Sequence, residues 1–277
     1  MRGLRNTLNY MKQLSLQEIK QIEFDLLKKF DTFCKENHIS YFLSNGTLLG
    51  AIKYKGFIPW DDDIDVLVPR EDYDKLISLF NDDASYKLFA FEKNHCFKFP
   101  FAKLCDMKTR KDELNINNGV VLGVDIDIFP LDAWAFDLVK AKSEVRLINK
   151  KMHLLELTKL IKPNSLNPVK RRLKGIVMIF LKIIGSKYFI QSIVDKCNLK
   201  KQKESPYVGC KSWCIYGFRE IIPAEVFSEI IEVEFEGEKF PAPIGYDIYL
   251  RSLYGDYEND PPIDKQKTHH TYAAYRI

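Results

Sequence analysis

Apolar side chains recur at intervals of three and four residues near the start of the chain, between Leu16 and Phe33. This spacing is typical of an amphipathic helix with one buried face. The segment Ser15-Leu16-Gln17-Glu18 carries the serine and the glutamate of a capping box, which marks the N-terminus of a helix. The pattern therefore predicts a helix that runs from Ser15 to Asn37.

A strand, a turn and a second helix are expected next. β-forming residues run from Ile39 to Leu43, Asn45-Gly46 is a turn dipeptide, and the residues from Thr47 to Lys53 suit a short helix. This order places backbone N–H groups at a helix N-terminus, where phosphate groups bind well. Gly46 would let the backbone approach a phosphate closely, and Thr47 adds a hydroxyl group.

Strands and helices continue to alternate further along the chain. The pattern predicts a strand from Asp63 to Val68 and a helix from Arg70 to Asn81. Strand patterns follow from Tyr86 to Cys105 and from Val120 to Phe129. The expected fold class is therefore α+β, with a mixed sheet flanked by helices.

The segment between Lys140 and Lys203 is strongly basic, with 17 Lys and Arg residues against three acidic residues. Its pattern is mostly helical, and a polar break from Lys162 to Pro168 separates two helices. We expect a basic helical insertion over residues 140–211. The core would then span residues 1–139, and residues 212–277 would complete it.

An apolar run from Gly175 to Ile184 lies within this basic segment. The run is too short to cross a bilayer. Basic residues beside it suit a helix that lies on a membrane surface. A buried core helix with a solvated basic end fits the same pattern equally well, so both interpretations stay open here.

The composition predicts a folded globular protein, because 277 residues with 46% hydrophobic residues can bury a substantial core. The net charge of +4 is mild, and we expect no nucleic-acid partner. No apolar run follows Met1, so we expect no signal peptide and a cytoplasmic protein, with its six cysteines reduced.

Four aspartates crowd into the segment Asp61-Asp62-Asp63-Ile64-Asp65, shortly after the turn. In a strand, Asp63 and Asp65 point to the same face, and Asp61 shares their alternation. Two carboxylates that lie close together repel each other by several kcal/mol, so they take up a proton or share a cation. Hard oxygen ligands favour Mg²⁺ or Mn²⁺.

Two stretches carry a resemblance to a known family. They are Ser44-Asn45-Gly46-Thr47-Leu48-Leu49-Gly50-Ala51-Ile52-Lys53 and Gly56-Phe57-Ile58-Pro59-Trp60-Asp61-Asp62-Asp63-Ile64-Asp65. These stretches resemble the LicD family of bacterial phosphocholine transferases, whose eukaryotic relatives are fukutin and fukutin-related protein. The resemblance to the family extends to Phe101-Ala102-Lys103-Leu104 and to Tyr249-Leu250-Arg251-Ser252-Leu253-Tyr254-Gly255-Asp256-Tyr257. The segment from Lys140 to about Lys211 shows little resemblance to it.

The resemblance implies that residues 1–139 form a nucleotidyltransferase-like catalytic core with three essential acids. Asp63 and Asp65 match the family's Asp-x-Asp pair, and Asp127 matches its third acid. By this resemblance the acids hold two Mg²⁺ or Mn²⁺ ions, and we count Asp61 as a further candidate ligand. Asp127 is expected nearest to the attacking hydroxyl group, and Asp125, which lies on the same strand face, is its competitor.

The implied reaction moves a phospho-alcohol group, with phosphocholine as the first choice, from CDP-choline or another CDP-alcohol to a sugar hydroxyl, with release of CMP. The implied acceptor is a lipid-linked glycan, such as a teichoic acid or lipopolysaccharide precursor, presented at the inner face of the cell membrane. His269 and His270 are candidates for contact with donor or acceptor. The residues expected to bind the donor are Asn45, Gly46, Thr47, Lys53 and Lys103.

Two other functions fit the same residues. A nucleotidyltransferase would use the same acids to move a nucleotide to a small alcohol, and would release pyrophosphate instead of CMP. A non-catalytic protein would only dock its basic segment on an anionic membrane. The crowded carboxylates argue against this second alternative, because their repulsion destabilises a fold that has no use for a metal ion.

Overall fold

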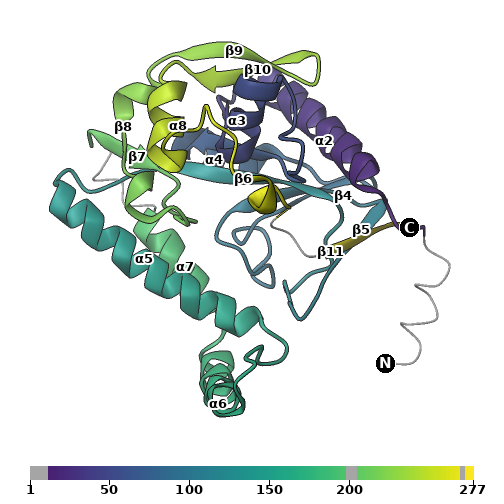
Figure 1. Ribbon diagram of the computed structural model, residues 1–277, viewed down its shortest axis with the longest axis vertical. Helices are drawn as coiled ribbons and strands as arrows, with labels where there is room; N and C mark the ends of the chain where they lie inside the picture. The colour runs from purple at the N-terminus through teal and green to yellow at the C-terminus, as the bar shows by residue number, and fades with distance from the viewer. Residues whose placement is uncertain (1–11, 198–204, 269–271) are drawn as a thin grey trace.

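The computed structural model describes residues 12–197, 205–268 and 272–277 (Figure 1). The chain forms an α+β fold around a mixed sheet, as predicted. In spatial order, the main strands of this sheet are β1 (Phe42–Leu43), β2 (Asp65–Pro69), β6 (Asp125–Ala133), β4 (Ala102–Asp106) and β3 (Tyr86–Phe89).

The strands β2 and β6 run parallel, and the other neighbouring pairs in this order are antiparallel. Two short antiparallel strands extend the sheet: β7 (Tyr207–Gly209) pairs with the end of β6, and β8 (Ile222–Pro223) pairs with β7. Two smaller sheets each have two strands. They are β9 (Ile230–Phe235) with β10 (Glu238–Pro243), and β5 (Thr109–Glu113) with β11 (Tyr272–Arg276).

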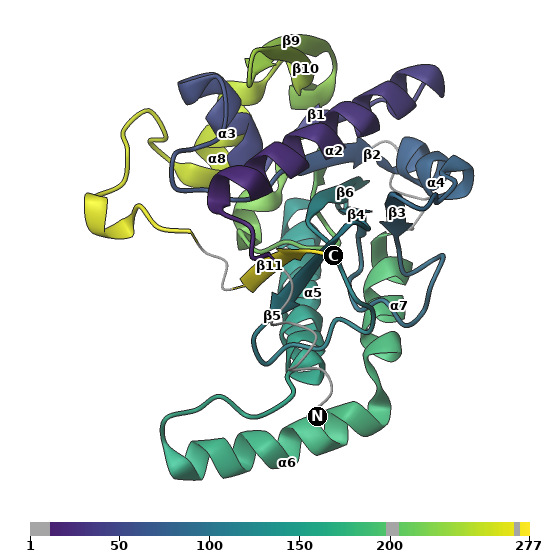
Figure 2. The same cartoon turned by 90° about the vertical axis from the view of Figure 1, so that its right-hand side faces the viewer.

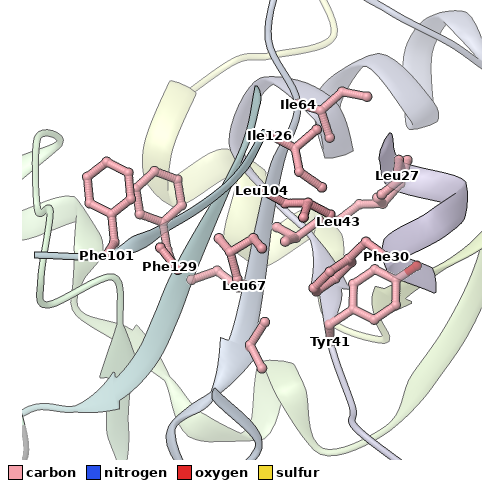
Figure 3. Packing of buried hydrophobic residues seen from close by; sticks show 14 of the residues in the cluster. Leu27, Phe30, Tyr41, Leu43, Ile64, Leu67, Phe101, Leu104, Ile126 and Phe129 are labelled. Carbon is pink, nitrogen blue, oxygen red and sulfur yellow. The ribbon is translucent and has the colours of Figure 1, made fainter. Parts of the chain in front are cut away.

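The helix α2 (Leu16–Glu36) lies against the sheet, as its periodicity predicts (Figure 2). Its capping box is formed: the Ser15 hydroxyl accepts a hydrogen bond from the backbone N–H of Glu18, and the Glu18 carboxylate accepts one from the N–H of Ser15. Leu27 and Phe30 have no exposed surface and belong to the same buried cluster as Ile126 of β6 (Figure 3).

The predicted strand–turn–helix order is confirmed by β1, α3 (Asn45–Tyr54), β2 and α4 (Arg70–Leu79). Several boundaries differ from the prediction. The helix α3 begins at Asn45 and not at Thr47, and β6 begins at Asp125 and not at Val120. The stretch predicted as strand from Tyr86 to Cys105 forms strands only at its two ends, β3 and β4. The strand β2 begins at Asp65 and not at Asp63, because Asp65 is the first residue of this segment that pairs with β6.

The described part of the basic segment is helical, and one break lies where the pattern predicts it, but a second break at Gly185 makes three helices and not two. It forms α5 (Leu138–Lys159), α6 (Pro168–Ile184) and α7 (Ser186–Cys197). The helices α5 and α7 share a second buried cluster with Trp134. In both views α6 lies apart from the rest of the fold (Figures 1 and 2). The expected division of the chain into three parts stays a prediction.

The C-terminal part adds α8 (Tyr246–Tyr254), which contacts α3. Short 3₁₀ helices precede and follow it at Gly217–Glu220, Ala224–Phe227 and Ile263–Lys265. This part therefore places residues from the end of the chain beside the turn that begins α3.

Candidate active site

Asp65 and Asp127 lie side by side in neighbouring strands. The parallel register of β2 and β6 pairs one directly with the other. Both side chains line a pocket of about 680 Å³, together with Asp61 and Asp63 from the segment that leads into β2. The pairing of β2 with β6 thus brings the third expected acid next to the Asp-x-Asp pair, although it lies far away in sequence.

Asn45 orients the carboxylate of Asp65. Its backbone is left-handed (φ 45°), a conformation that asparagine tolerates better than most residues, and its Nδ2 donates to Asp65 Oδ2 at 3.1 Å. The hydroxyl of Tyr249 in α8 donates to Asn45 Oδ1 at 3.0 Å, which fixes the direction of the amide. Thr47 Oγ1 accepts a hydrogen bond from the N–H of Asp65 at 2.8 Å, so α3 holds both the backbone and the side chain of Asp65.

Gly46 allows Asp61 to lie against the start of α3. A Cβ atom at this position would come within 2.5 Å of Asp61 Oδ2, and both residues line the pocket. The neighbouring Asp62 is buried and contacts the C-terminal segment instead, because its carboxylate accepts a hydrogen bond from the hydroxyl of Thr268. The structure therefore places Asp61, and not Asp62, among the pocket acids.

Two lysines lie next to Asp125 and Asp127, and their side chains are only 8% (Lys103) and 11% (Lys111) exposed. Lys103 faces Asp127 in the register of β4 and β6, contacts its carboxylate, and lies 3.3 Å from Asp125 Oδ2. Lys111 contacts the other oxygen of Asp125. Burial alone would raise the pKa of Asp125, but the two lysines outweigh this effect and lower the pKa below its ordinary value. Of the two acids, Asp127 is the one that lines the pocket.

Lys103, which is expected to contact the donor diphosphate, has carboxylate partners in the structure. The ammonium group of Lys103 is paired with carboxylates, because its strand register sets it opposite Asp127. Lys53 does line the pocket, and its Nζ lies 2.5 Å from Asp260 Oδ1. Donor binding by either lysine stays a prediction.

The environment of Asp65 and Asp127 disfavours two free negative charges. Burial raises the pKa of Asp65 well above its ordinary value, and the charges of Asp63 and Asp127 raise it further. Burial also raises the pKa of Asp127, although Lys103 opposes this effect. Two adjacent carboxyl groups of this kind readily take up a proton or share a cation.

Carboxylate oxygens are suitable ligands for Mg²⁺ or Mn²⁺, but these acids alone do not provide a complete coordination shell. Within the described ranges, no group of three His, Cys, Asp or Glu side chains converges closely enough to hold an ion by itself. Mg²⁺ is commonly held by one or two carboxylates together with waters and substrate phosphates. The side-by-side pair Asp65 and Asp127, with Asp63 at the same pocket, fits an ion of this kind.

Aromatic side chains form a large part of the remaining pocket wall. Tyr216 and Tyr254 form a pair, with ring centroids 5.3 Å apart and a hydrogen bond of 2.9 Å between their hydroxyls. Both tyrosines line the same pocket as Asp65 and Asp127, and burial raises the pKa of both hydroxyls. The aromatic residues that line the pocket are Tyr54, Trp60, Phe129, Trp213, Tyr216, Tyr254 and Tyr257.

Several residues beside the acids are missing from the sequence-based prediction, among them Lys111, Tyr249 and the Tyr216–Tyr254 pair. Glu23 of α2 is another, with 2% of its surface exposed. Burial raises the pKa of Glu23 well above its ordinary value, and the charge of Asp63 raises it further. A charged residue inside the apolar face of a predicted helix is a signal that could have identified it. His269 and His270 lie outside the described residues.

Comparisons of the sequence with known proteins identify its family. The profile of the family described as LicD/FKTN/FKRP, nucleotidyltransferase domain, matches residues 38–154, which include all the pocket acids from Asp61 to Asp127. An uncharacterised protein of Rickettsia typhi is 38% identical over 68 residues, which cover 24% of this chain and 20% of that protein. An uncharacterised protein of Rickettsia prowazekii is 41% identical over 61 residues, which cover 22% of this chain and 20% of that protein.

A lipopolysaccharide cholinephosphotransferase LicD of Haemophilus influenzae is 31% identical to the chain over 276 residues. The alignment covers 96% of this chain and 99% of the Haemophilus protein, so it includes the helical segment and the C-terminal part as well as the acids. On the strength of this end-to-end similarity and the family match, the chain belongs to the LicD family.

Proposed function

We propose that the protein transfers phosphocholine from CDP-choline to a sugar hydroxyl of a lipid-linked glycan and releases CMP. The observation that carries this proposal is one pocket that combines the adjacent acids Asp65 and Asp127 with the aromatic pair Tyr216 and Tyr254. The acids suit a cation and the phosphates of the donor, and the aromatic rings suit its choline group. The name of the Haemophilus relative supports the choice of phosphocholine. We further propose that the core is nucleotidyltransferase-like and that α5 to α7 are inserted into it.

The proposed cofactor is Mg²⁺ or Mn²⁺, held by Asp65 and Asp127 with Asp63 nearby. When bound, such an ion neutralises the diphosphate of the donor and withdraws charge from the phosphorus that is attacked. The chain itself contributes the orientation of these ligands. Asn45 fixes Asp65 through its amide, and Lys103 fixes Asp127 through an ion pair.

Asp127 is the proposed acceptor of the proton that the sugar hydroxyl loses. Its side chain lines the pocket next to Asp65, so a carboxylate oxygen is available to a sugar hydroxyl bound there. In this step the sugar oxygen forms a bond to the phosphorus of phosphocholine, and the bond from that phosphorus to the bridging oxygen of CMP breaks. The proton moves to Asp127, and CMP leaves as the anion.

The proposed choline site is formed by the faces of Tyr216 and Tyr254. A quaternary ammonium group has no hydrogen to donate, so proteins recognise it through aromatic rings and nearby negative charge. Both features are present, because the two tyrosines line the pocket together with Asp256, an acid outside the proposed metal site. This arrangement gives a physical reason for choline as the transferred alcohol.

A panel of donors tests the proposal. The purified protein with Mg²⁺ and an oligosaccharide acceptor is incubated with CDP-choline, CDP-ethanolamine, CDP-ribitol or CDP-glycerol, and free CMP is measured by chromatography. We expect the highest kcat/KM with CDP-choline and none after chelation of the metal. Release of pyrophosphate from CTP and an alcohol, without CMP from any donor of the panel, would assign the protein to the nucleotidyltransferases instead.

Substitutions of Tyr216 test the choline site separately. Tyr216→Leu removes the ring, and we expect the KM for CDP-choline to rise about two- to thirtyfold, since a cation–π contact is worth about 0.5–2 kcal/mol. Tyr216→Phe keeps the ring and loses only the hydroxyl bond to Tyr254, so its KM should stay near that of the parent protein. An equal rise in both variants would show that the hydroxyl, and not the ring, matters.

A further inference from the structure

The helix α6 presents a broad apolar face to solvent. Ile183 is 77% exposed, Phe180 64% and Ile179 62%. Only Met178 and Leu181 of this helix are buried. The other exposed apolar residues in and next to α6 are Leu166, Val169, Leu173, Ile176, Val177, Ile184 and Tyr188. A continuous exposed face of this kind marks an interaction surface.

The charge around this face has one sign. The chain has no acidic residue between Glu156 and Asp195, and that interval holds eight lysines and arginines. Five of them lie in α6 itself: Lys170, Arg171, Arg172, Lys174 and Lys182. A second copy of the chain is a poor partner for the apolar face, because a symmetric pair of α6 helices would bring these like charges together.

The helix α6 is formed and capped without a binding partner. Asn167 caps its N-terminus, because the side-chain Oδ1 accepts hydrogen bonds from the N–H groups of Val169 and Lys170 at 3.0 and 3.1 Å. Met178 and Leu181 are its buried side chains, and Leu181 belongs to the buried cluster that α5 and α7 share. A preformed helix of this kind binds without paying the entropy of ordering.

We propose that α6 docks in the plane of a membrane whose surface is negatively charged, with its apolar face in the lipid and its basic side chains at the headgroups. The charge complementarity and the amphipathic pattern both match such a surface. Among the described residues, no single helix is long and apolar enough to span a bilayer. Taken together, α6 and α7 are long and apolar enough to span a bilayer, but the chain bends by 69° between them. The helix α7 also buries Phe189, Ile190 and Ile193 in the protein.

Vesicle sedimentation of the full chain tests this docking and requires no donor or acceptor, so its result is independent of the proposed transfer reaction. The parent protein should sediment with phosphatidylcholine vesicles that contain phosphatidylglycerol, and much less with phosphatidylcholine alone or at high salt. The variant Ile179→Glu/Phe180→Glu/Ile183→Glu should bind at least about tenfold more weakly. The variant Arg171→Glu/Arg172→Glu should lose about 25-fold or more, since each basic residue near the surface contributes about fivefold.

The matched control is Leu114→Glu/Ile230→Glu/Ile248→Glu, which adds the same charge at exposed apolar positions outside α6. We expect it to bind vesicles like the parent protein, and thermal melting confirms that each variant is folded. The proposal is overturned if the parent protein fails to bind anionic vesicles, or if the α6 variant and the control lose binding equally. A dimer of the parent protein that the α6 substitutions dissociate, without any vesicle binding, would assign the face to a second copy of the chain.

Discussion

Replacing Asp65 by asparagine should abolish transfer and at the same time stabilise the folded protein in metal-free buffer. Asparagine keeps the shape of the side chain but gives a metal ion a much poorer ligand. Since metal coordination contributes several kcal/mol to charge stabilisation in such reactions, we expect kcat/KM to fall about a thousandfold. Stability should rise because the substitution removes a buried charge that Asp63 and Asp127 repel.

The stability gain of Asp65→Asn should depend on pH in a defined direction. The folded-state pKa of Asp65 lies above its unfolded value. The cost of its charged form is therefore absent below the unfolded pKa and grows as the pH rises towards the folded one. We expect no difference in Tm between variant and parent at about pH 4, and a higher Tm of the variant at about pH 7.

Asp25→Asn is the matched control, because Asp25 is an exposed aspartate on α2 whose side chain is 50% accessible. It should change neither transfer nor the pH dependence of Tm. Retention of full activity by a folded Asp65→Asn protein would contradict the assignment of Asp65. A lower Tm of that variant at neutral pH would contradict the account of its buried charge.

Replacing Asp132 by asparagine should strongly destabilise the protein. Asp132 is 1% exposed, and its two oxygens accept hydrogen bonds from Arg70 Nε at 2.7 Å and Nη2 at 2.9 Å. This pair joins the start of α4 to β6, the strand that carries Asp127. Loss of this charged partner leaves the guanidinium of Arg70, whose side chain is only 19% exposed, with Asp74 at 3.2 Å as its remaining ion pair, so we expect the free energy of unfolding to fall by about 3–5 kcal/mol. Urea denaturation followed by circular dichroism measures this change.

An exposed ion pair provides the comparison. Lys239 and Glu232 lie 3.5 Å apart across β9 and β10, with side chains 73% and 65% exposed. Glu232→Gln should therefore change the free energy of unfolding by about 1 kcal/mol or less. Equal effects of the two substitutions would show that burial does not determine the contribution of the Arg70–Asp132 pair.

The sequence predicted several helices and strands correctly, because capping and turn residues next to one another in the chain determine where these elements begin. The capping box at Ser15 and Glu18 marks the start of α2, and the Asn45-Gly46 turn marks the start of α3. The hairpin of β9 and β10 is absent from the prediction, although its signal is also local. The strand β9 alternates apolar and charged residues from Ile231 to Phe235, and it is followed by the turn Glu236-Gly237, both residues of which have positive φ in the structure.

The sequence alone did not predict that Asp127 joins Asp63 and Asp65 in one site, and only the family resemblance indicated it. Nothing local to Asp127 shows that it pairs with Asp65, because this depends on the register of two strands that are distant in sequence. The same limit applies to Tyr249, which holds Asn45 from the C-terminal part of the chain. The pairing of Lys103 with Asp127 is likewise a property of strand register, which periodicity alone does not give.

The central claim is that Asp65 and Asp127 hold a divalent cation against the diphosphate of the donor. Mn²⁺ binding, measured by electron paramagnetic resonance with and without CDP-choline, tests it most directly. We expect CDP-choline to tighten Mn²⁺ binding in the parent protein and in Asp25→Asn, and to have no such effect in Asp127→Asn. Equal Mn²⁺ affinity and equal tightening in the parent protein and in Asp127→Asn would contradict the claim.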